Sequence, residues 1–395
     1  MEKQYQNYID VLRAFVQGNA PAELDVNALM ELARIHSTMG ILCHIGLVHP
    51  GLADPSMRGW MRHHCLTETA LCGRRAELAK VLAAELDKHD IDFILFKGLV
   101  VREYYAIPEL RTFGDVDIII RKEDRQKCDA LMLELGYERN EDWEPSYSYR
   151  KGLEYYELHS RVIGFDVSDK ADFVGYFEDI WSRTRPAQVV DLPHARELTP
   201  EFHFLYLLTH LAKHISASGA GIRMYLDLAF FIQHFRNALD WDWVSRELEK
   251  LCLADFANVA LAAVEQWFGV ESPLPLEMVE ASMLDDFTDF TIAGGVYGYV
   301  GREKGEVFLK QQNRNGEKVS KWKTLLHHAF PPTKVLVNKY AYLEPCPWLL
   351  PMAWLQRLMD KRKEWSRFAA HTRQILTADE EKVLKLKRIY QKIGL

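Results

Sequence analysis

The stretch FILFKGLVVREYYAIPELRTFGDVDIII at residues 93–120 decides how this chain folds. It begins with a short apolar run that leads into the Lys-Gly dipeptide at 97–98. It ends with a second apolar run that starts with Gly-Asp-Val-Asp at 114–117. Short apolar runs bounded by turn residues are typical of buried strands. The segment therefore predicts a strand–helix–strand unit.

Two aspartates open the second apolar run. Alternate side chains of a strand lie on one face, so Asp115 and Asp117 are expected to point together while Val116 and Ile118 face the core. Two carboxylates held this close repel each other unless a cation lies between them. Mg²⁺ is the natural cation, because it prefers hard oxygen ligands and bridges to substrate phosphates. An isolated Asp-x-Asp is more often a solvated turn, but this apolar context favours a metal site.

The order of these elements resembles the nucleotidyltransferase superfamily with a polymerase-β-like fold. More narrowly, it is similar to an uncharacterised bacterial group that has a Lys-Gly turn, a helix ending in Tyr-Tyr and an R-x-x-G-D-x-D-I strand. Here these elements are Lys97-Gly98, Tyr104-Tyr105 and the segment 111–118. The resemblance extends to the L-L-P-x-A-W-L-Q-R stretch at 349–357. It implies Mg²⁺-dependent transfer of a nucleoside monophosphate from an NTP, with ATP favoured, to an acceptor hydroxyl or phosphate.

A two-metal site generally needs a third carboxylate from a neighbouring strand. Glu157 is the first candidate, because the resembled group carries an E-L-H stretch at this place; Asp166 is the competitor. Asp115, Asp117 and Glu157 are thus predicted to bind two Mg²⁺ ions, with Mn²⁺ as an alternative. Glu157 would also take the proton of the acceptor.

The predicted triphosphate site consists of Lys97, Gly98, Arg111 and Gly114. Related nucleotidyltransferases have Gly-Ser in the turn, and Gly98 would again let backbone N–H groups meet phosphate at a helix start. Lys97 would supply a point charge to a phosphate. Two alternatives stay open: Lys97 pairs with one of the aspartates and leaves the site weakened or inactive, and Arg111 fixes an aspartate or is solvated.

A helix rich in histidines follows the predicted core. His210 and His214 are four residues apart on one helix face, and the next helix carries Arg223 and Asp227 at the same spacing. H-L-A-K-H lacks the Glu of H-E-x-x-H, so a metalloprotease is not indicated. The resemblance implies that these four residues and His159 line the substrate cleft. The alternative is plain core structure, with hydrogen-bonded histidines and an intrahelical Arg223–Asp227 pair.

The composition is that of an ordinary globular protein, with 395 residues of which 48% are hydrophobic. The formal charge of −7 gives no sign of a nucleic-acid binder, so long nucleic acid is disfavoured as an acceptor. Six scattered cysteines suit a reducing compartment. No apolar run approaches the roughly 18 residues of a membrane span, and the N-terminus does not resemble a secretory signal. These features predict a cytoplasmic protein.

The predicted fold is α/β (α+β): a small mixed sheet flanked by an N-terminal helical segment and a helical C-terminal half. Four parts are expected, namely helices at 1–88, the catalytic core at 89–185, a helical cleft region at 186–300, and a loop with helices at 301–395.

Local patterns add further predictions: a helix over 29–48, a helix over 123–139 with Gly136 at its C-cap, strands at 147–160 and 162–169 with turns at Gly152 and Gly164, and an exposed loop at 301–320.

Two functions of other classes remain open. The chain could be a non-catalytic nucleotidyltransferase-like scaffold that binds a nucleotide or a protein partner, with Lys97 neutralising the aspartates. It could also be a kinase-like phosphotransferase that uses the same metals, attacks the γ-phosphorus and releases ADP in place of pyrophosphate. The acceptor is open between a small molecule, a protein side chain and an RNA end.

Overall fold

The computed structural model describes residues 2–143, 146–164, 167–296, 298, 321–337, 339–360, 372, 373, 375–377 and 380–395. Two predictions lie outside these residues: the exposed loop at 301–320, and Asp166 as a competitor of Glu157.

Seven strands form one mixed sheet. They are β1 (Phe93–Leu95), β2 (Val116–Ile120), β3 (Glu138–Trp143), β4 (Ser146–Lys151), β5 (Glu154–His159), β6 (Thr184–Pro186) and β7 (Ala195–Leu198). The strand order is β3-β4-β5-β2-β1-β7-β6. β1 pairs with β2 antiparallel and with β7 parallel, and β2 pairs with β5 parallel. The predicted α/β (α+β) class with a mixed sheet is confirmed.

Helices precede, interrupt and follow the sheet. Those before it are α1 (Lys3–Gln17), α2 (Val26–Ile35), α3 (Met39–Val48) and α4 (Arg58–Lys88). Those between strands are α5 (Gly98–Val101), α6 (Arg125–Glu134) and α7 (Phe173–Tyr176). Those after it are α8 (Pro200–Ala217), α9 (Ile222–Phe235), α10 (Trp241–Lys250), α11 (Ala254–Phe268), α12 (Ala281–Gly294), α14 (Lys321–Ala329), α15 (Thr333–Leu336), α16 (Leu350–Asp360) and α18 (Glu380–Lys392). In the described part of the chain, no helix has the length and apolar character needed to cross a membrane.

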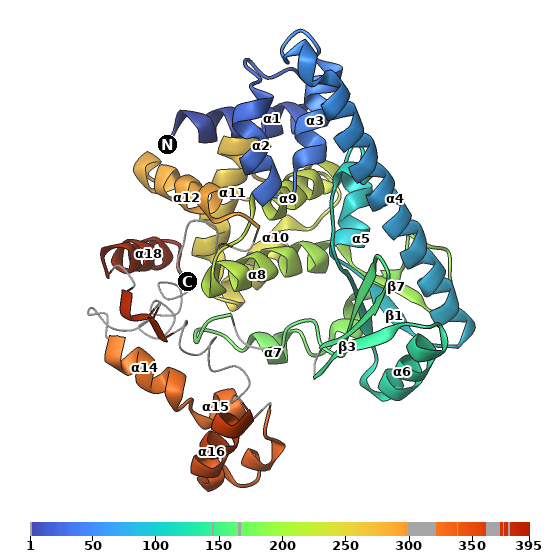
Figure 1. Cartoon of the computed structure of the whole chain (residues 1–395), viewed down its shortest axis with the longest axis vertical. Coiled ribbons are helices and arrows are strands. Elements are labelled where there is room, and N and C mark those ends of the chain that lie inside the picture. The colour runs from blue at the N-terminus through green and yellow to red at the C-terminus, as the bar shows by residue number, and fades with distance from the viewer. Residues whose placement is uncertain are drawn as a thin grey trace.

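Among the described residues, two large hydrophobic clusters hold the sheet and the helices around it together. The larger one joins the N-terminal helices to α8–α12, so that Phe15 of α1 packs against Phe230 of α9 at 5.7 Å between ring centroids. The smaller one packs α4 and α6 against the sheet through residues such as Leu86, Phe93 and Ile118. Figure 1 shows α4 running from the N-terminal helices along one side of the molecule toward the sheet and α6. The helix α4 therefore connects both clusters.

Glycine-dependent turns explain where two elements end. Gly136 follows α6 with φ +82°, as predicted for the residue after a helix, because glycine enters the left-handed region without steric penalty. The strand predicted at 147–160 is two strands, β4 and β5, joined at Gly152 with φ +59°. Glycine at the first central position is typical of a two-residue hairpin turn.

Three local predictions were wrong in detail. The helix predicted over 29–48 breaks between α2 and α3, where Ser37 has φ +55°. The described residues of 162–169 form no strand; Val162 and Ile163 are buried in the larger cluster instead, so their apolar character reflects core packing. β2 begins at Val116, which leaves Asp115 in the preceding loop.

Candidate active site

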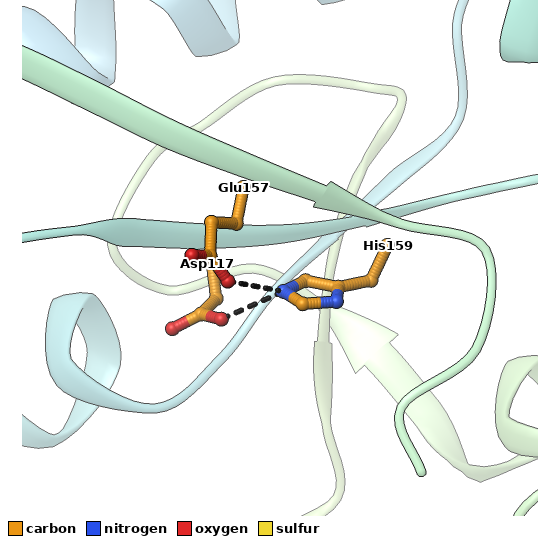
Figure 2. Close-up of side chains that lie close together, drawn as sticks. All are labelled: Asp117, Glu157 and His159. Atoms are coloured by element: carbon orange, nitrogen blue, oxygen red, sulfur yellow. Dashed lines mark hydrogen bonds and ion pairs between the residues drawn. The ribbon is translucent and has the colours of Figure 1, made fainter. Parts of the chain in front are cut away.

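Three polar side chains meet on one face of the central strands. Because β2 and β5 pair in parallel with Asp117 opposite Glu157 and Ile119 opposite His159, these side chains come to the same face. Nε2 of His159 lies 2.8 Å from Oδ1 of Asp117 and 3.5 Å from Oε2 of Glu157 (Figure 2). One potential ligand atom of each residue lies within 4.8 Å of the others. Strand register, and not sequence proximity, makes this cluster.

Lys97 reaches the same carboxylate from the turn after β1. Its Nζ lies 2.7 Å from Oδ1 of Asp117, so the salt bridge weighed as an alternative is present. The backbone of Lys97 has φ +54°, which is uncommon for a residue with a Cβ. Its N–H donates to Nε2 of the buried His203 at 3.2 Å, and this bond helps to hold the turn. Sequence reasoning gave His203 no role.

The charges of this cluster depend on one another. Burial alone would raise the pKa of Asp117, but the Lys97 ammonium and the hydrogen bond from His159 outweigh burial and lower it. Burial would likewise lower the pKa of Lys97, yet Asp117 raises it. The pKa of His159 is also raised, because its bonds to Asp117 and Glu157 outweigh the effect of burial. Asp117 is thus ionised and Lys97 charged at neutral pH.

Asp115 lies at the solvent side of this cluster. It is not among the three residues with convergent ligand atoms, and its side chain reaches solvent. Even so, its pKa is raised, first because the surrounding protein limits its hydration and then because Asp117 and Glu157 are near, with Lys97 opposing. Three carboxylates therefore lie close to Lys97. This surplus of negative charge suits a hard divalent cation.

A second ion pair lies behind the turn. Nε and Nη2 of Arg111 donate to the two oxygens of Asp227 at 3.1 and 2.6 Å, and the hydroxyl of Tyr105 donates to Oδ1 at 2.7 Å. Arg111 and Asp227 are both buried. A Cβ on Gly98 would lie 2.2 Å from Nη1 of Arg111. Gly98 therefore makes room for Arg111, which fixes an aspartate of α9.

The intrahelical Arg223–Asp227 ion pair, weighed as an alternative, is not found between these two described residues. Asp227 is engaged by Arg111, and Nη1 of Arg223 instead donates to the Thr112 carbonyl at 2.7 Å. Both bonds connect α9 to the segment between α5 and β2. Asp227 pairs with Arg111 because two hydrogen bonds to one guanidinium are stronger than a single i, i+4 contact with Arg223 along the helix.

The helix α8 covers one end of the cluster. Nε2 of His210 and Nε2 of His214 lie 3.1 Å apart, and burial lowers the pKa of His214 to about 4 and that of His210 well below its usual range. Both rings are neutral at pH 7, with one donating to the other. Lys213 also faces the cluster: burial and then Lys97 lower its pKa, while Asp117 and Glu157 oppose this. Sequence reasoning missed Lys213, although it lies inside the H-L-A-K-H stretch.

A cavity of about 1110 Å³ opens beside Asp115. Its walls come from α2, α4 and the loop 112–115, together with Tyr155, Arg223 and Val296. A Cβ built on Gly114 would have no other atom within 4 Å, so there is free space beside this residue. No sequence pattern indicated the cavity, because α2 and the loop are about 80 residues apart and only folding brings them together.

Comparison with known proteins places the chain among nucleotidyltransferases. The family described as "uncharacterised nucleotidyltransferase" matches residues 22–269, which confirms the family resemblance over these residues; the stretch at 349–357 lies outside the match. No curated protein matches the chain significantly. A solution structure of the antibiotic-resistance factor ANT(2'')-Ia is similar, at 14% identity, with a TM-score of 0.34, over 49% of this chain and 97% of that one. A likeness this low carries no argument about mechanism.

Proposed function

Because the chain belongs to this nucleotidyltransferase family, we propose that it transfers a nucleoside monophosphate from an NTP, with ATP favoured, to a small-molecule or protein acceptor and needs Mg²⁺. The observation that supports this proposal is the convergence of Asp117, Glu157 and His159 beside Asp115 on one sheet face. The carboxylate oxygens of Asp115, Asp117 and Glu157 fit Mg²⁺ or Mn²⁺. A bound metal would supply neutralisation of charge at the reacting phosphates.

Each residue has a proposed task. Asp115, Asp117 and Glu157 hold the metal, and Glu157 takes the proton of the acceptor. Lys97 and the backbone at Gly98 contact the triphosphate, and Gly114 leaves room beside it. Arg111 is a positioning residue, because its donors already bind Asp227 and the Thr112 carbonyl.

The proposed site is tested by calorimetric titration of ATP, CTP, GTP and UTP with and without Mg²⁺. Wild type is expected to bind ATP only with Mg²⁺, and Asp115→Asn/Asp117→Asn to lose this binding. Asp191→Asn removes a carboxylate at an exposed position away from the cluster and should bind as wild type does. Pyrophosphate release with an acceptor would support nucleotidyl transfer, whereas ADP release would show that the reaction is phosphoryl transfer. If the double variant binds ATP with Mg²⁺ as tightly as wild type does, Asp115 and Asp117 do not form the proposed metal site.

The Lys97–Asp117 ion pair supports a second candidate, a non-catalytic scaffold that binds a nucleotide or a partner. In that case Lys97 takes the place of a metal and the carboxylates serve only folding. The scaffold predicts ATP binding that is independent of Mg²⁺ and no turnover in any acceptor screen. Mg²⁺-dependent turnover would exclude it.

A further inference from the structure

The cavity beside Asp115 has a polar wall made by one helix. Trp60, His64, Glu68 and Arg75 of α4 all line it, and their spacing of four, four and seven residues puts them on one helix face. A helix face that only packs against protein is normally apolar. The polar and aromatic groups on this inward face therefore suit contact with a ligand.

Two arginines of the wall have unused hydrogen-bonding capacity. Nη1 of Arg75 donates to the Phe113 carbonyl at 2.6 Å, and Nη1 of Arg223 donates to Thr112. A guanidinium has five N–H donors. Within the described residues, the Nε atom of each is buried without a hydrogen-bond partner, and no bond of either Nη2 is found. The Nε atoms are closed off from the cavity, but neither Nη2 is among the buried unsatisfied atoms, so each Nη2 can donate to an anionic oxygen group in the cavity.

The acidic groups of the wall are already engaged. Glu31 pairs with Arg34 at 2.6 Å, and Oε2 of Glu68 accepts the Gly40 N–H at 2.9 Å. Asp115 belongs to the proposed metal site. The arginines of the wall that have no carboxylate partner among the described residues are Arg75 and Arg223, which both hold the segment leading to Asp115.

We propose that this cavity binds the acceptor of the transfer, and that the acceptor is a small molecule with an anionic oxygen group joined to an apolar or aromatic body. This rests on the proposed function. Arg75 and Arg223 bind the anionic group, and Trp60 and Phe113 contact the apolar body. The volume of about 1110 Å³ lies near the upper end of the range for small-molecule pockets, which is roughly 300–1,000 Å³.

The position of the cavity fits the chemistry. A hydroxyl of the bound acceptor would face Asp115, where its oxygen forms a bond to the α-phosphorus of the NTP. The bond from that phosphorus to pyrophosphate breaks, pyrophosphate leaves, and the hydroxyl proton passes to Glu157. The product is the acceptor carrying a nucleoside monophosphate.

Phenyl phosphate is a suitable probe, because it combines an anionic oxygen group with an aromatic ring. Calorimetric titration without nucleotide or Mg²⁺ is expected to show binding to wild type and at least about tenfold weaker binding to Arg75→Gln/Arg223→Gln, since charge-assisted bonds are lost. Arg34→Gln is the matched control, because this arginine of the wall is already paired with Glu31. Phenyltrimethylammonium, with the opposite charge, should not bind.

Three outcomes would overturn the proposal: no binding of phenyl phosphate to wild type, unchanged binding by the double variant, or tighter binding of the cationic probe. If the glutamine variant fails to fold, Arg75→Lys/Arg223→Lys keeps both charges and a donor for each carbonyl, and its binding should be weakened, not abolished. Asp117 lies outside the cavity wall, so the Asp117→Asn variant should still bind the probe. Loss of transfer in that variant is therefore distinguishable from loss of the acceptor site.

Discussion

Two ion pairs on either side of the Lys97-Gly98 turn show how similar chemistry can serve different ends. The Arg111–Asp227 pair is closed: two bonds from the guanidinium and one from Tyr105 engage both oxygens of Asp227, and both side chains are buried. The Lys97–Asp117 pair is open, since the same Oδ1 is shared with His159 and further carboxylates lie beside it. An ion pair whose hydrogen bonds are all made can only stabilise the fold. An ion pair with an excess of nearby carboxylates keeps negative charge that a ligand can bind.

The largest effect is expected from a substitution that breaks the closed Arg111–Asp227 pair. Asp227→Asn leaves the buried Arg111 charge without its partner, so the free energy of unfolding should fall by about 3–5 kcal/mol. Urea denaturation measures this loss. Asp191→Asn, at an exposed position, should stay within about 0.5 kcal/mol of wild type. An Asp227→Asn protein as stable as wild type would show that the pair is not structural.

His203 connects the two ion pairs, because its ring accepts a hydrogen bond from the Lys97 N–H and interacts electrostatically with Asp227. The pH dependence of the free energy of unfolding tests its protonation state. Burial lowers the pKa of His203 to about 3, against about 6.5 in an unfolded chain. The unfolded state therefore takes up the proton first, and stability present above pH 6.5 is lost as the pH falls toward 3. Between pH 7 and 5 this residue should account for about 2 kcal/mol of lost stability.

His203→Gln keeps an acceptor for the Lys97 N–H but does not titrate. Urea denaturation at pH 7 and pH 5 should show a loss smaller by that amount than in wild type. Identical losses in the two proteins would mean that folding does not lower the pKa of His203.

The two glycines of the predicted triphosphate site give a matched pair of substitutions. Gly98→Ala places a Cβ 2.2 Å from Nη1 of Arg111, which cannot move without breaking the closed pair, so a destabilisation of about 1–3 kcal/mol is expected. Gly114→Ala meets nothing within 4 Å and should change stability by less than about 0.5 kcal/mol. Thermal unfolding of the two variants decides this. Equal stability would mean that Arg111 has room to shift.

The smallest effect concerns the open pair. Lys97→Met removes the positive charge paired with Asp117, so the repulsion among the three carboxylates increases and Mg²⁺ should bind about tenfold more tightly, a change of about 1.4 kcal/mol. Calorimetric titration with Mg²⁺ alone measures the change. Weaker binding in the variant would show that Lys97 supports the metal and does not compete with it.

Local features of this fold were predictable from sequence, and long-range partners were not. The strands around 93–120, the end of α6 at Gly136 and the shared face of Asp117 and Glu157 follow from periodicity, turn residues and a family motif. The partner of Asp227 lies 116 residues away, so no spacing rule identifies it.

The cavity and the helix break at Ser37 depend on how separate segments meet. Apolar residues such as Val162 and Ile163 predict burial equally well in a strand or in an irregular segment. The sequence therefore indicates which groups carry the chemistry, and the three-dimensional packing decides which of them remain free to act.

The dipeptide Thr112–Phe113 determines how small a working piece of this protein can be. The Thr112 hydroxyl donates to the Ser37 carbonyl, and the two backbone carbonyls of the dipeptide accept from Arg223 and Arg75. These partners belong to the α2–α3 connection, α9 and α4. A fragment limited to residues 89–185 would lack all three, and the segment before Asp115 would gain conformational freedom. The minimal autonomous unit must therefore include both the N-terminal helices and α9.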